Sequence, residues 1–600
     1  MCGIYLTNIP YNDNEVRTKL NSISFRGPDF TGIHKVNNLT FGHVRLSILD
    51  LDPRSNQPMT SENLTIVYNG EIYNYKTIKK ELLDLGYSFN TESDTEVLLI
   101  GYKHWGKNIL DKLNGMFAFS IYDLVSNKIF SARDRLGVKP FYYSWNDDKL
   151  EICSQIKPML AGKKINDDAV SMFLDCMFIP SPYTIVEGVY KLPAGNYMEF
   201  DLNTNNFTIN EYWNLKPVKI KDISYEDAKN ELHDLLLDAV RIRLQSDVPI
   251  GSFLSGGIDS ALVSSIAARV SDSQISTFSI GFDNPEYDES KIAEQYSQIL
   301  KTKHKSTVCN PSDFLSLIPK LTEVYDEPFA DSSALPSLLL NKVTKEYVTV
   351  ALSGDGGDES FIGYNHFDSL VKNQKIIDLP YPIRKFIASS GILKFLGMNT
   401  HRIQNALKTK TRNDFIENIF SRKGFLLKKK NQDYMKYYQG YKTWSNIFLQ
   451  KAADLNIKLW LENDSNVKVD RASMAYSVEV RSPFLDYRIV EYARTLPINY
   501  KYEKGRQKKI LRDILKEYIP EEVFDQPKRG FSVPIGDWMR TELKEEFLKS
   551  LNDDFLNMVP NLDVAKFKLL LSEHMEQNID HTMHIWKLYV LSKWYEKYQF

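Results

Sequence analysis

The chain has 600 residues, a formal net charge of −2 and a predicted isoelectric point of about 6.6. This length exceeds what one hydrophobic core normally supports, so we expect two or more domains. The near-neutral charge gives no electrostatic reason to expect a nucleic-acid partner, and the sequence shows neither a signal-peptide pattern nor an apolar run that could span a membrane. The four cysteines form no Cys-x-x-Cys pair, which argues against a zinc site or a disulfide framework, so we expect a cytoplasmic protein.

The first part of the chain is rich in short strands. Apolar or alternating runs at residues 4–7, 39–44, 64–68, 117–123 and 141–144 are bounded by Gly, Pro, Asn or Asp and predict strands. Two helices are predicted among them, at residues 75–85 and 94–104. This pattern favours a stacked β structure with helices on its outside, and we place this first domain at residues 1–210.

The pattern changes near residue 212, and we assign residues 211–600 to a second domain. Ser224 followed by Asp227 is typical of a helix start. Predicted strands at 248–254, 275–282 and 347–352 then alternate with predicted helices at 261–270 and 290–300. Such alternation predicts a parallel sheet that binds ligands at the carboxyl ends of its strands. From about residue 368 onward the sequence is mostly helical.

Cys2 is a candidate nucleophile, because it becomes the first residue once Met1 is removed. A thiol must lose its proton to attack a carbonyl. An α-amine has a pKa of roughly 7.7–8.0 and a thiol one of about 8.5, so the amine of Cys2 is suited to act as its base. A cysteine near a terminus is usually only a small residue, and its significance depends on the motifs that follow.

Those motifs occur in a fixed order: Arg-Gly-Pro-Asp at 26–29, Arg-Leu-Ser-Ile-Leu-Asp at 45–50, Gln-Pro-Met at 57–59, Asn-Gly-Glu-Ile-Tyr-Asn at 69–74, Ser-Asp-Thr-Glu at 93–96 and Arg-Asp-Arg-Leu-Gly at 133–137. With Cys2, the series closely resembles the glutaminase domain of class II amidotransferases. These are N-terminal-nucleophile enzymes with two stacked antiparallel sheets between helix layers, an α+β fold.

The resemblance implies a role for each candidate residue in binding and hydrolysing glutamine. Cys2 would be the nucleophile, and Asn69 and Gly70 would form the oxyanion hole. The resemblance also implies that Arg45 binds the α-carboxylate of glutamine, whereas its α-ammonium is bound by Glu71 and Asp94. The chemistry is consistent, since a guanidinium pairs well with a carboxylate and carboxylates suit an ammonium.

The second domain carries a loop, Leu-Ser-Gly-Gly-Ile-Asp-Ser at 254–260, between a predicted strand and a predicted helix. It is not a Walker-type loop, but its glycines let backbone N–H groups approach an anion at the start of a helix. Asp259 is compatible with phosphates only if a cation lies between them, and Mg²⁺ fits that description. A second acidic, glycine-rich turn follows at 353–359.

Further motifs lie at 467–474, 479–486, 508–512 and 527–531. With the two loops, they resemble the synthetase domain of glutamine-hydrolysing asparagine synthetases, an α/β ATP-pyrophosphatase fold, and the resemblance covers essentially the whole chain. We interpret residues 467–485 as a helix and loop that pack in the core and form a wall of the active site.

The resemblance implies that Ser255, Gly256, Gly257, Asp259 and Ser260 hold pyrophosphate. It places adenine between Leu254 and Ile280, and the rest of the nucleotide against Ser353 and Gly354. It also implies Mg²⁺ ligands at Asp259 and Asp358, an acid that helps to deprotonate ammonia at Asp355, and a cation beside the departing pyrophosphate at Lys508.

Two positions depart from the family pattern. Gln155 stands where Glu is usual, and Gln526 stands where Arg is frequent. Neither is among the residues assigned above. The first could alter the domain interface or the ammonia path, and the second the C-terminal region.

We therefore predict an enzyme that makes asparagine from aspartate, glutamine and ATP by way of a β-aspartyl-AMP intermediate, with a homodimer expected from the family. Two alternatives remain open: an amidotransferase of the same fold acting on another carboxylate, such as a uronic-acid sugar or a peptide, and a binding or storage protein without activity. The catalytic residues Cys2, Asp355 and Lys508 are intact, which argues against the last. A phosphosugar amidotransferase would lack the loop at 254–260.

Overall fold

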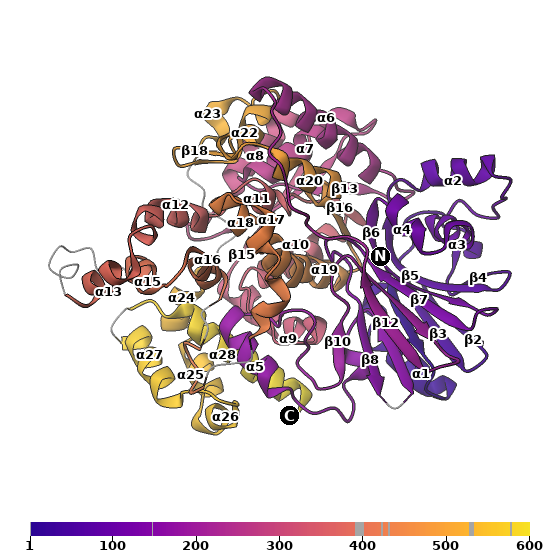
Figure 1. Ribbon diagram of the computed structural model, residues 1–600, viewed down its shortest axis with the longest axis horizontal. Coiled ribbons are helices and arrows are strands. Elements are labelled where there is room, and N and C mark those ends of the chain that lie inside the picture. Colours follow the sequence, from indigo (N-terminus) through magenta and orange to yellow (C-terminus); the bar gives the residue numbers. More distant parts are fainter. Residues whose placement is uncertain are drawn as a thin grey trace.

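The computed structural model describes residues 2–146, 148–390, 401–421, 424–429, 433–526, 533–576 and 579–599 (Figure 1). The motif at 527–531 lies outside these described residues.

Residues of the first half form two six-stranded antiparallel sheets. The strands of the first sheet follow the order β10 (Val189–Lys191), β8 (Tyr142–Asn146), β9 (Lys149–Cys153), β1 (Gly3–Thr7), β3 (Leu39–Arg45), β2 (Phe30–Val36). Those of the second follow the order β12 (Asn206–Glu211), β11 (Asn196–Asp201), β7 (Lys128–Arg133), β6 (Gly115–Asp123), β5 (Leu64–Ile72), β4 (Met59–Ser61). The five predicted strands are all present.

Helices cover the outer faces of this sandwich. The second sheet is covered by α2 (Tyr75–Asp84), α3 (Asp94–Trp105) and the short α4 (Ile109–Lys112), and the first by α1 (Asp13–Asn21). Helix α5 (Asp167–Cys176) instead contacts α28 (Thr582–Tyr598), so the end of the first half packs into the second (Figure 1).

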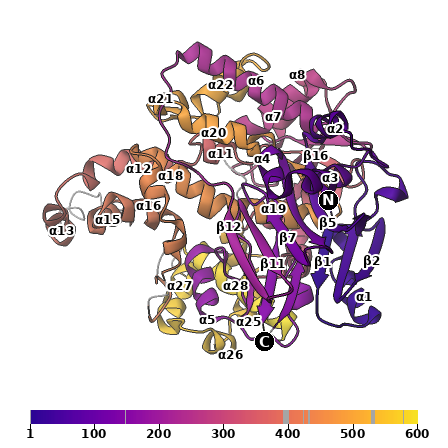
Figure 2. The same ribbon diagram turned by 45° about the vertical axis from the view of Figure 1, so that its right-hand side comes forward.

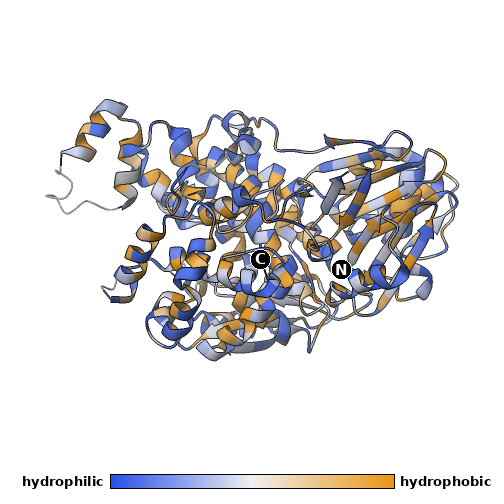
Figure 3. Ribbon diagram, turned by 90° about the horizontal axis from the view of Figure 1, so that it is seen from below, coloured by the Kyte–Doolittle hydropathy of each residue, from blue (hydrophilic) through white to orange (hydrophobic). Residues whose placement is uncertain are grey.

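Strand β5 shows why these segments form a sandwich. Ile66 and Tyr68 pack in the core beneath α3, whereas Val67 packs between the two sheets with Ile4. Successive side chains of a strand point to opposite faces, and here both faces are covered, so the strand is apolar on both sides. Hydrophobic residues are accordingly frequent along the strands of both sheets (Figure 3). The predicted fold class of this half is confirmed.

A five-stranded parallel sheet forms the centre of the second half, in the order β15 (Lys303–Cys309), β14 (Ser276–Phe282), β13 (Ile250–Phe253), β16 (Val350–Leu352), β17 (Glu479–Arg481). The chain runs from β13 through β14 to β15 on one side, and then crosses to β16 on the other. The topological switch point therefore lies between β13 and β16, which is where parallel sheets bind ligands. The sequence predicted β13, β14 and β16 but neither edge strand.

The helices of this half cover both faces of the parallel sheet. One face is covered by α6 (Tyr225–Arg243), α7 (Ile258–Val270), α8 (Ser290–Leu300) and α22 (Lys509–Leu515). The other is covered by α9 (Pro311–Tyr325), α10 (Ala334–Thr344) and α19 (Asn466–Met474). The side chain of Ser224 accepts a hydrogen bond from the Asp227 N–H, which caps α6 as predicted.

The remaining residues are mostly helical, as predicted. Between β16 and α19 lie α11 (Gly357–Ser360), α12 (Asn365–Ile377), α13 (Tyr381–Ser389), α15 (His401–Lys408), α16 (Arg412–Phe420), α17 (Tyr441–Trp444), α18 (Phe448–Leu455) and a π-helical segment (Asn456–Ser465). After β17 follow α20 (Tyr487–Thr495), α21 (Ile498–Lys501), the hairpin β18 (Tyr502–Glu503) and β19 (Arg506–Gln507), α23 (Glu521–Phe524), α24 (Ile535–Arg540), α25 (Lys544–Ser550), α26 (Asp553–Met558) and α27 (Val564–Glu576).

Helices α13 and α15 project from the side opposite the stacked sheets in both Figure 1 and Figure 2. Among the described residues, no helix combines the length and apolar character needed to cross a membrane.

Candidate active sites

A small cavity of about 40 Å³ lies beside Cys2, immediately before strand β1. It is lined by all of the residues predicted to bind glutamine except Asn69, whose contact with Cys2 is described below. The lining residues are Cys2, Arg45, Leu46, Ile48, Leu49, Ser55, Gln57, Tyr68, Gly70, Glu71, Ser93, Asp94, Thr95 and Glu479. These come from β3, β5, α3 and the segments beside them in the first half, together with one residue of β17 from the second half.

Asn69 contacts Cys2 directly. Its Oδ1 accepts a hydrogen bond from the Cys2 backbone N–H at 2.9 Å. Its Nδ2 is buried and has no hydrogen-bond partner among the residues that the structure describes. A buried donor without a partner calls for an explanation, and a developing oxyanion would supply the acceptor.

Gly70 is held close to the neighbouring strand. A Cβ at this position would lie 2.1 Å from the Met116 carbonyl oxygen, so only glycine fits. The sequence suggested that Asn69 and Gly70 follow a strand that ends at Tyr68. They lie inside β5 instead, because the strand continues to Ile72. The sheet therefore fixes the backbone at the predicted oxyanion hole.

Arg45 provides the positive charge of the cavity. Its guanidinium donates hydrogen bonds to the Asp50 carbonyl at 2.6 Å and to Asn56 Oδ1 at 2.7 Å. These bonds hold a buried arginine in one position. A fixed guanidinium is well suited to bind a carboxylate.

Glu71 and Asp94 provide the negative charge. Burial raises the pKa of Glu71, and burial raises the pKa of Asp94 to about 6. Asp94 Oδ2 accepts hydrogen bonds from the Tyr68 hydroxyl at 2.8 Å and the Ile72 N–H at 2.9 Å. With Arg45, these carboxyls give the cavity both charges that an α-amino acid requires.

Burial also raises the pKa of the Cys2 thiol. A raised pKa keeps the thiol protonated, so an adjacent base is needed to generate the nucleophile. This is the requirement that a free α-amine on the same residue would meet.

A larger cavity, of about 290 Å³, lies at the switch point of the parallel sheet. All of the residues predicted for the nucleotide site line it: Leu254, Ser255, Gly256, Gly257, Asp259, Ser260, Ile280, Ser353, Gly354, Asp355, Asp358 and Lys508. The structure thus brings together residues that are more than 250 positions apart in the sequence. Residues to which the sequence assigned no individual role also line this cavity: Glu289, Glu359, Tyr364, Lys468 and Arg512.

The loop after β13 is shaped by its two serines. Ser255 Oγ accepts a hydrogen bond from the Gly257 N–H at 3.1 Å and lies 2.8 Å from Ser260 Oγ. The loop leads directly into α7, a helix of 13 residues. A glycine-containing turn at a helix N-terminus is suited to bind phosphate groups.

Lys508 joins the two acidic loops. Its Nζ lies 2.5 Å from Asp259 Oδ2 and 2.5 Å from Asp358 Oδ1. A Cβ on Gly363 would lie 1.9 Å from Lys508 Cε, so glycine is needed for the lysine to reach this position. The two carboxylates therefore converge on one point beside the cavity.

This convergence fits a divalent cation that shares its ligands with phosphate oxygens. Mg²⁺ is usually bound by one or two carboxylates together with substrate phosphates and water. In the described part of the chain, no group of three His, Cys, Asp or Glu side chains could hold a metal ion. The two carboxylates of Asp259 and Asp358 would suit a cation of this kind, because they converge on one point.

Asp355 lies in the turn after β16, next to a network of charges. Burial raises its pKa, and the ammonium of Lys468 acts in the opposite direction. Lys468 is itself paired with Asp331 at 2.9 Å. The Asp355 carboxyl lines the cavity, and its raised pKa favours its acting as a proton acceptor.

Both departures from the family pattern have a structural setting. Gln155 Nε2 donates hydrogen bonds to the Val324 carbonyl at 2.8 Å and to Asp326 Oδ2 at 3.2 Å, across the interface of the two halves. Glutamate here would face another carboxylate, so the amide suits this position. Gln526 lines the nucleotide cavity.

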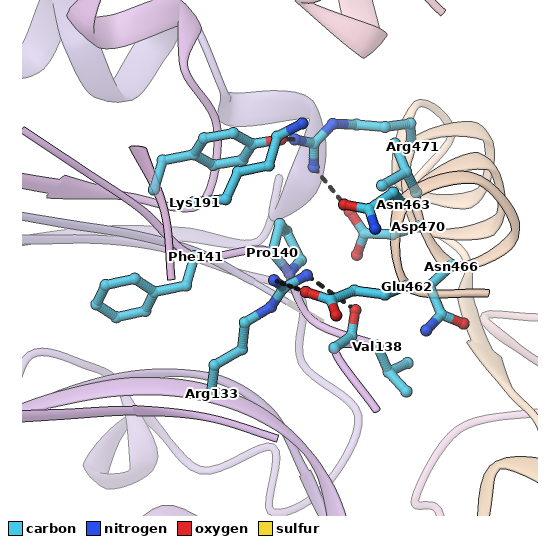
Figure 4. A pocket seen from close by; sticks show the side chains of 13 residues that line it. Arg133, Val138, Pro140, Phe141, Lys191, Glu462, Asn463, Asn466, Asp470 and Arg471 are labelled. Carbon is cyan, nitrogen blue, oxygen red and sulfur yellow. Dashed lines mark hydrogen bonds and ion pairs between the residues drawn. The ribbon is translucent and has the colours of Figure 1, made fainter. Parts of the chain in front are cut away.

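Buried ion pairs hold the two halves together. Arg26 pairs with Asp470 through two hydrogen bonds of 2.8 and 3.0 Å. Arg133 Nη1 lies 3.2 Å from Glu462 Oε1 (Figure 4). Removing one partner of a buried pair is strongly destabilising, because it leaves the other charge unpaired.

Residues 467–485 form a wall of the nucleotide cavity as predicted, through Lys468 and Val469. The sequence did not show that the same segment reaches the first cavity through Glu479. The only available signal was the acidic residue itself, within a run that has the composition of a packed core.

Comparisons with known proteins agree with this two-part construction. Residues 1–213 match a glutamine amidotransferase domain and residues 231–596 match the asparagine synthase family. The chain is 33% identical over 589 residues to glutamine-hydrolyzing asparagine synthetase 1 of Bacillus subtilis, covering 96% of this chain and 92% of that protein. It is 40% identical over 398 residues to putative glutamine-hydrolyzing asparagine synthetase 2 of Methanocaldococcus jannaschii, covering 61% and 76%. It is 30% identical over 578 residues to amidase chry2 of Gibberella zeae, covering 87% and 85%.

The fold and the family matches define a chain in which a glutamine amidotransferase domain is joined to a second domain built on a parallel sheet. It belongs to the asparagine synthase family. The family predicted from the motifs is confirmed.

Proposed function

We propose that the protein makes asparagine from aspartate and ATP, using ammonia that it releases from glutamine. The observation that carries this proposal is the grouping of the predicted residues around two separate cavities of one chain in this family. One cavity has the charges of an amino-acid site with a thiol, and the other has the loops of a nucleotide site.

In the first cavity, Cys2 Sγ attacks the side-chain carbonyl carbon of glutamine after its proton passes to the α-amine. The negative charge on the carbonyl oxygen is stabilised by Asn69 Nδ2 and the Gly70 N–H. The amine returns the proton to the departing nitrogen, and ammonia leaves. Water then hydrolyses the γ-glutamyl thioester, which releases glutamate and restores the thiol.

In the second cavity, an oxygen of the aspartate β-carboxylate attacks the α-phosphorus of ATP, and pyrophosphate leaves. This activation is required because a carboxylate is a poor acyl donor, whereas AMP is a good leaving group. Ammonia then attacks the acyl carbon, its excess proton passes to Asp355, and asparagine and AMP are released. Lys508 stabilises the negative charge of the pyrophosphate.

Asp259 and Asp358 would hold Mg²⁺ in this cavity. When bound, Mg²⁺ neutralises part of the negative charge of the phosphates. The convergence of the two carboxylates beside Lys508 supports this assignment.

Ammonia must pass between the cavities without contact with bulk water, because protonation would remove its nucleophilicity. A small cavity of about 10 Å³ beside Asp355 supports an internal route. Residues of both halves line it, including Val138 and Lys139 from the first and Asn466, Val480 and Leu485 from the second.

The direct test is to supply glutamine and ATP and to measure pyrophosphate release with a panel of carboxylic acids. We expect release with aspartate and formation of asparagine. Release with another acid, such as a uronic-acid sugar or a peptide, but not with aspartate, would leave the amidotransferase chemistry in place and refute the proposed acceptor.

A further inference from the structure

Strand β17 lies between the two cavities. It is the edge strand of the parallel sheet and pairs with β16, with Arg481 opposite Leu352. Its first residue, Glu479, lines the cavity of Cys2. The residue after the strand, Ser482, lies at the turn that carries Asp355. A strand of three residues therefore touches both candidate sites.

The side chain of Arg481 contacts Glu71 and Glu479, which both line the glutamine cavity. It is fully buried, and its Nη2 lies 3.1 Å from Glu71 Oε2. Its Nε donates a hydrogen bond of 2.6 Å to Glu479 Oε1. Its Nη1 donates to the carbonyl oxygens of Arg243 at 2.8 Å and Gln245 at 2.6 Å. The guanidinium is thus held in one position against the carboxylate proposed to bind the ammonium of glutamine.

The backbone of the same residue contacts Ser353, which lines the nucleotide cavity. The Arg481 carbonyl accepts a hydrogen bond from the Ser353 N–H at 2.9 Å. The neighbouring Ser482 Oγ donates to the Asp355 carbonyl at 2.5 Å. Two hydrogen bonds therefore fix the turn of residues 353–355 to β17, and Ser353 and Asp355 both line the nucleotide cavity.

These contacts have a consequence for glutamine binding. An ammonium on Glu71 would compete with Arg481 for the same carboxylate, and Arg481 would then interact more with Glu479. A closely packed interior does not absorb such a change locally, because it transmits displacements to its neighbours. On the side of β17 that faces the nucleotide cavity, Arg481 and Ser482 contact Ser353 and Asp355.

We propose that Arg481 is a positioning residue that couples the glutamine cavity to the turn of residues 353–355, so that occupation of one cavity changes the affinity of the other. The identity of the two ligands rests on the proposed function. Coupling between sites is reciprocal at equilibrium, so either ligand can be used to measure it.

The test uses the full chain with Cys2→Ala, which binds glutamine without hydrolysing it. Glutamine affinity is measured by calorimetry, alone and with aspartate plus a non-hydrolysable ATP analogue and Mg²⁺. We expect the Kd for glutamine to change by a factor on the order of five or more. In the same background, Arg481→Met should abolish this change, and Arg481→Lys, which retains the charge, should preserve part of it.

The matched control is Arg133→Met. Arg133 is also buried between the halves and pairs with Glu462 (Figure 4). It donates hydrogen bonds to the carbonyl oxygens of Lys139, Leu192 and Gly137. None of these partners lines a candidate cavity, whereas Arg481 contacts Glu71 and Glu479 of one cavity and Ser353 of the other. The change in the Kd for glutamine on addition of the other ligands should therefore persist in Arg133→Met. If this change in Kd is lost in both Arg481→Met and Arg133→Met, the interface is generally disturbed and the assignment to Arg481 is overturned.

Ser482→Ala keeps the proposal testable if Arg481→Met does not fold, since it removes only the hydrogen bond to Asp355. We expect a smaller coupling factor in this variant. The proposal is refuted if the change in the Kd for glutamine is the same in every variant that folds. It is also refuted if the Cys2→Ala parent shows no such change. Glutaminase and ammonia-dependent synthesis of the unaltered enzyme are measured in parallel. If both are present without coupling, only this inference fails, and if either is absent, the proposed function fails.

Discussion

Lys508 Nζ lies 2.5 Å from Asp259 Oδ2, although 249 residues separate the two in the sequence. Asp358 lies equally close to the same nitrogen. The ammonium of Lys508 balances the charge of these two carboxylates, and its side chain is buried. In the proposed function, the two carboxylates would hold Mg²⁺ that accompanies ATP, and the Lys508 ammonium would pair with phosphate oxygens.

The first prediction concerns these carboxylates. Asp259→Asn and Asp358→Asn should each abolish pyrophosphate release while leaving glutamine hydrolysis intact. Each variant removes charge from a metal site that has few protein ligands, and we expect a rate loss on the order of a thousandfold or more. The measurement is pyrophosphate release with aspartate and ammonium across a Mg²⁺ titration.

Asp355→Asn serves as a comparison within the same cavity. It should allow pyrophosphate release on adenylation but slow amide formation, because it removes the proton acceptor. A near-normal rate for Asp259→Asn or Asp358→Asn at ordinary Mg²⁺ concentration would remove that residue from the metal site.

The second prediction separates the two chemistries. Cys2→Ala should abolish synthesis with glutamine and retain most synthesis with ammonium chloride, because the nucleotide cavity does not contain Cys2. Amide formation is measured with each nitrogen source. Loss of both activities in a folded variant would mean that the two sites do not act separately.

The third prediction concerns the chain terminus. A form that retains Met1, or that carries an N-terminal tag, should lose glutaminase activity, because an acylated amine cannot accept a proton. Mass spectrometry of active enzyme should find Cys2 as the first residue. Full glutamine hydrolysis by a form that bears Met1 would exclude the α-amine as the base.

The fourth prediction tests the buried Nδ2 of Asn69. Asn69→Ala should lower kcat for glutamine hydrolysis on the order of a hundredfold to a thousandfold, the usual effect of losing one oxyanion donor. KM should change less, since the donor acts mainly in the transition state. The matched control is Asn63→Ala, which removes a hydrogen bond to Asp123 on the same sheet. Equal losses in both variants would contradict the role of Asn69.

The fifth prediction is a pH dependence of glutamine binding. Burial raises the pKa of Asp94 to about 6, so this carboxyl becomes neutral as the pH falls through that value. Glutamine affinity should therefore weaken as the pH falls through about 6, because a neutral acid no longer attracts an ammonium. Calorimetry with Cys2→Ala measures this without interference from hydrolysis. The same profile in Asp94→Asn would show that another group titrates.

Much of both sites could be predicted from the sequence, because their motifs are contiguous and have local chemical meaning. The loop at 254–260 lies between a strand and a helix with strong apolar periodicity, and the structure places it there. Cys2, Arg45 and Asp94 meet in one cavity as expected. Local patterns of this kind carry information about local structure. The order of the motifs along the chain further indicated that a glutaminase domain is followed by a synthetase domain.

What could not be predicted depends on distant parts of the chain. Strand β17 has three residues, too few to show the alternation that marks a strand. Glu479 reaches the glutamine cavity only because the two halves dock along this edge. The strand that contains Asn69 extends beyond its predicted end because its pairing with β6 continues to Ile72, opposite Gly115. Pairing partners of this kind are not visible in a single sequence.

The measurement that tests the central claim most directly follows the nitrogen atom. The enzyme is supplied with glutamine labelled with ¹⁵N in its side-chain amide, together with aspartate, ATP and Mg²⁺. We predict asparagine that carries ¹⁵N in its side-chain amide. AMP and pyrophosphate should each form in the same molar amount as asparagine. Labelled ammonia without asparagine, or ADP and phosphate in place of AMP and pyrophosphate, would contradict the account.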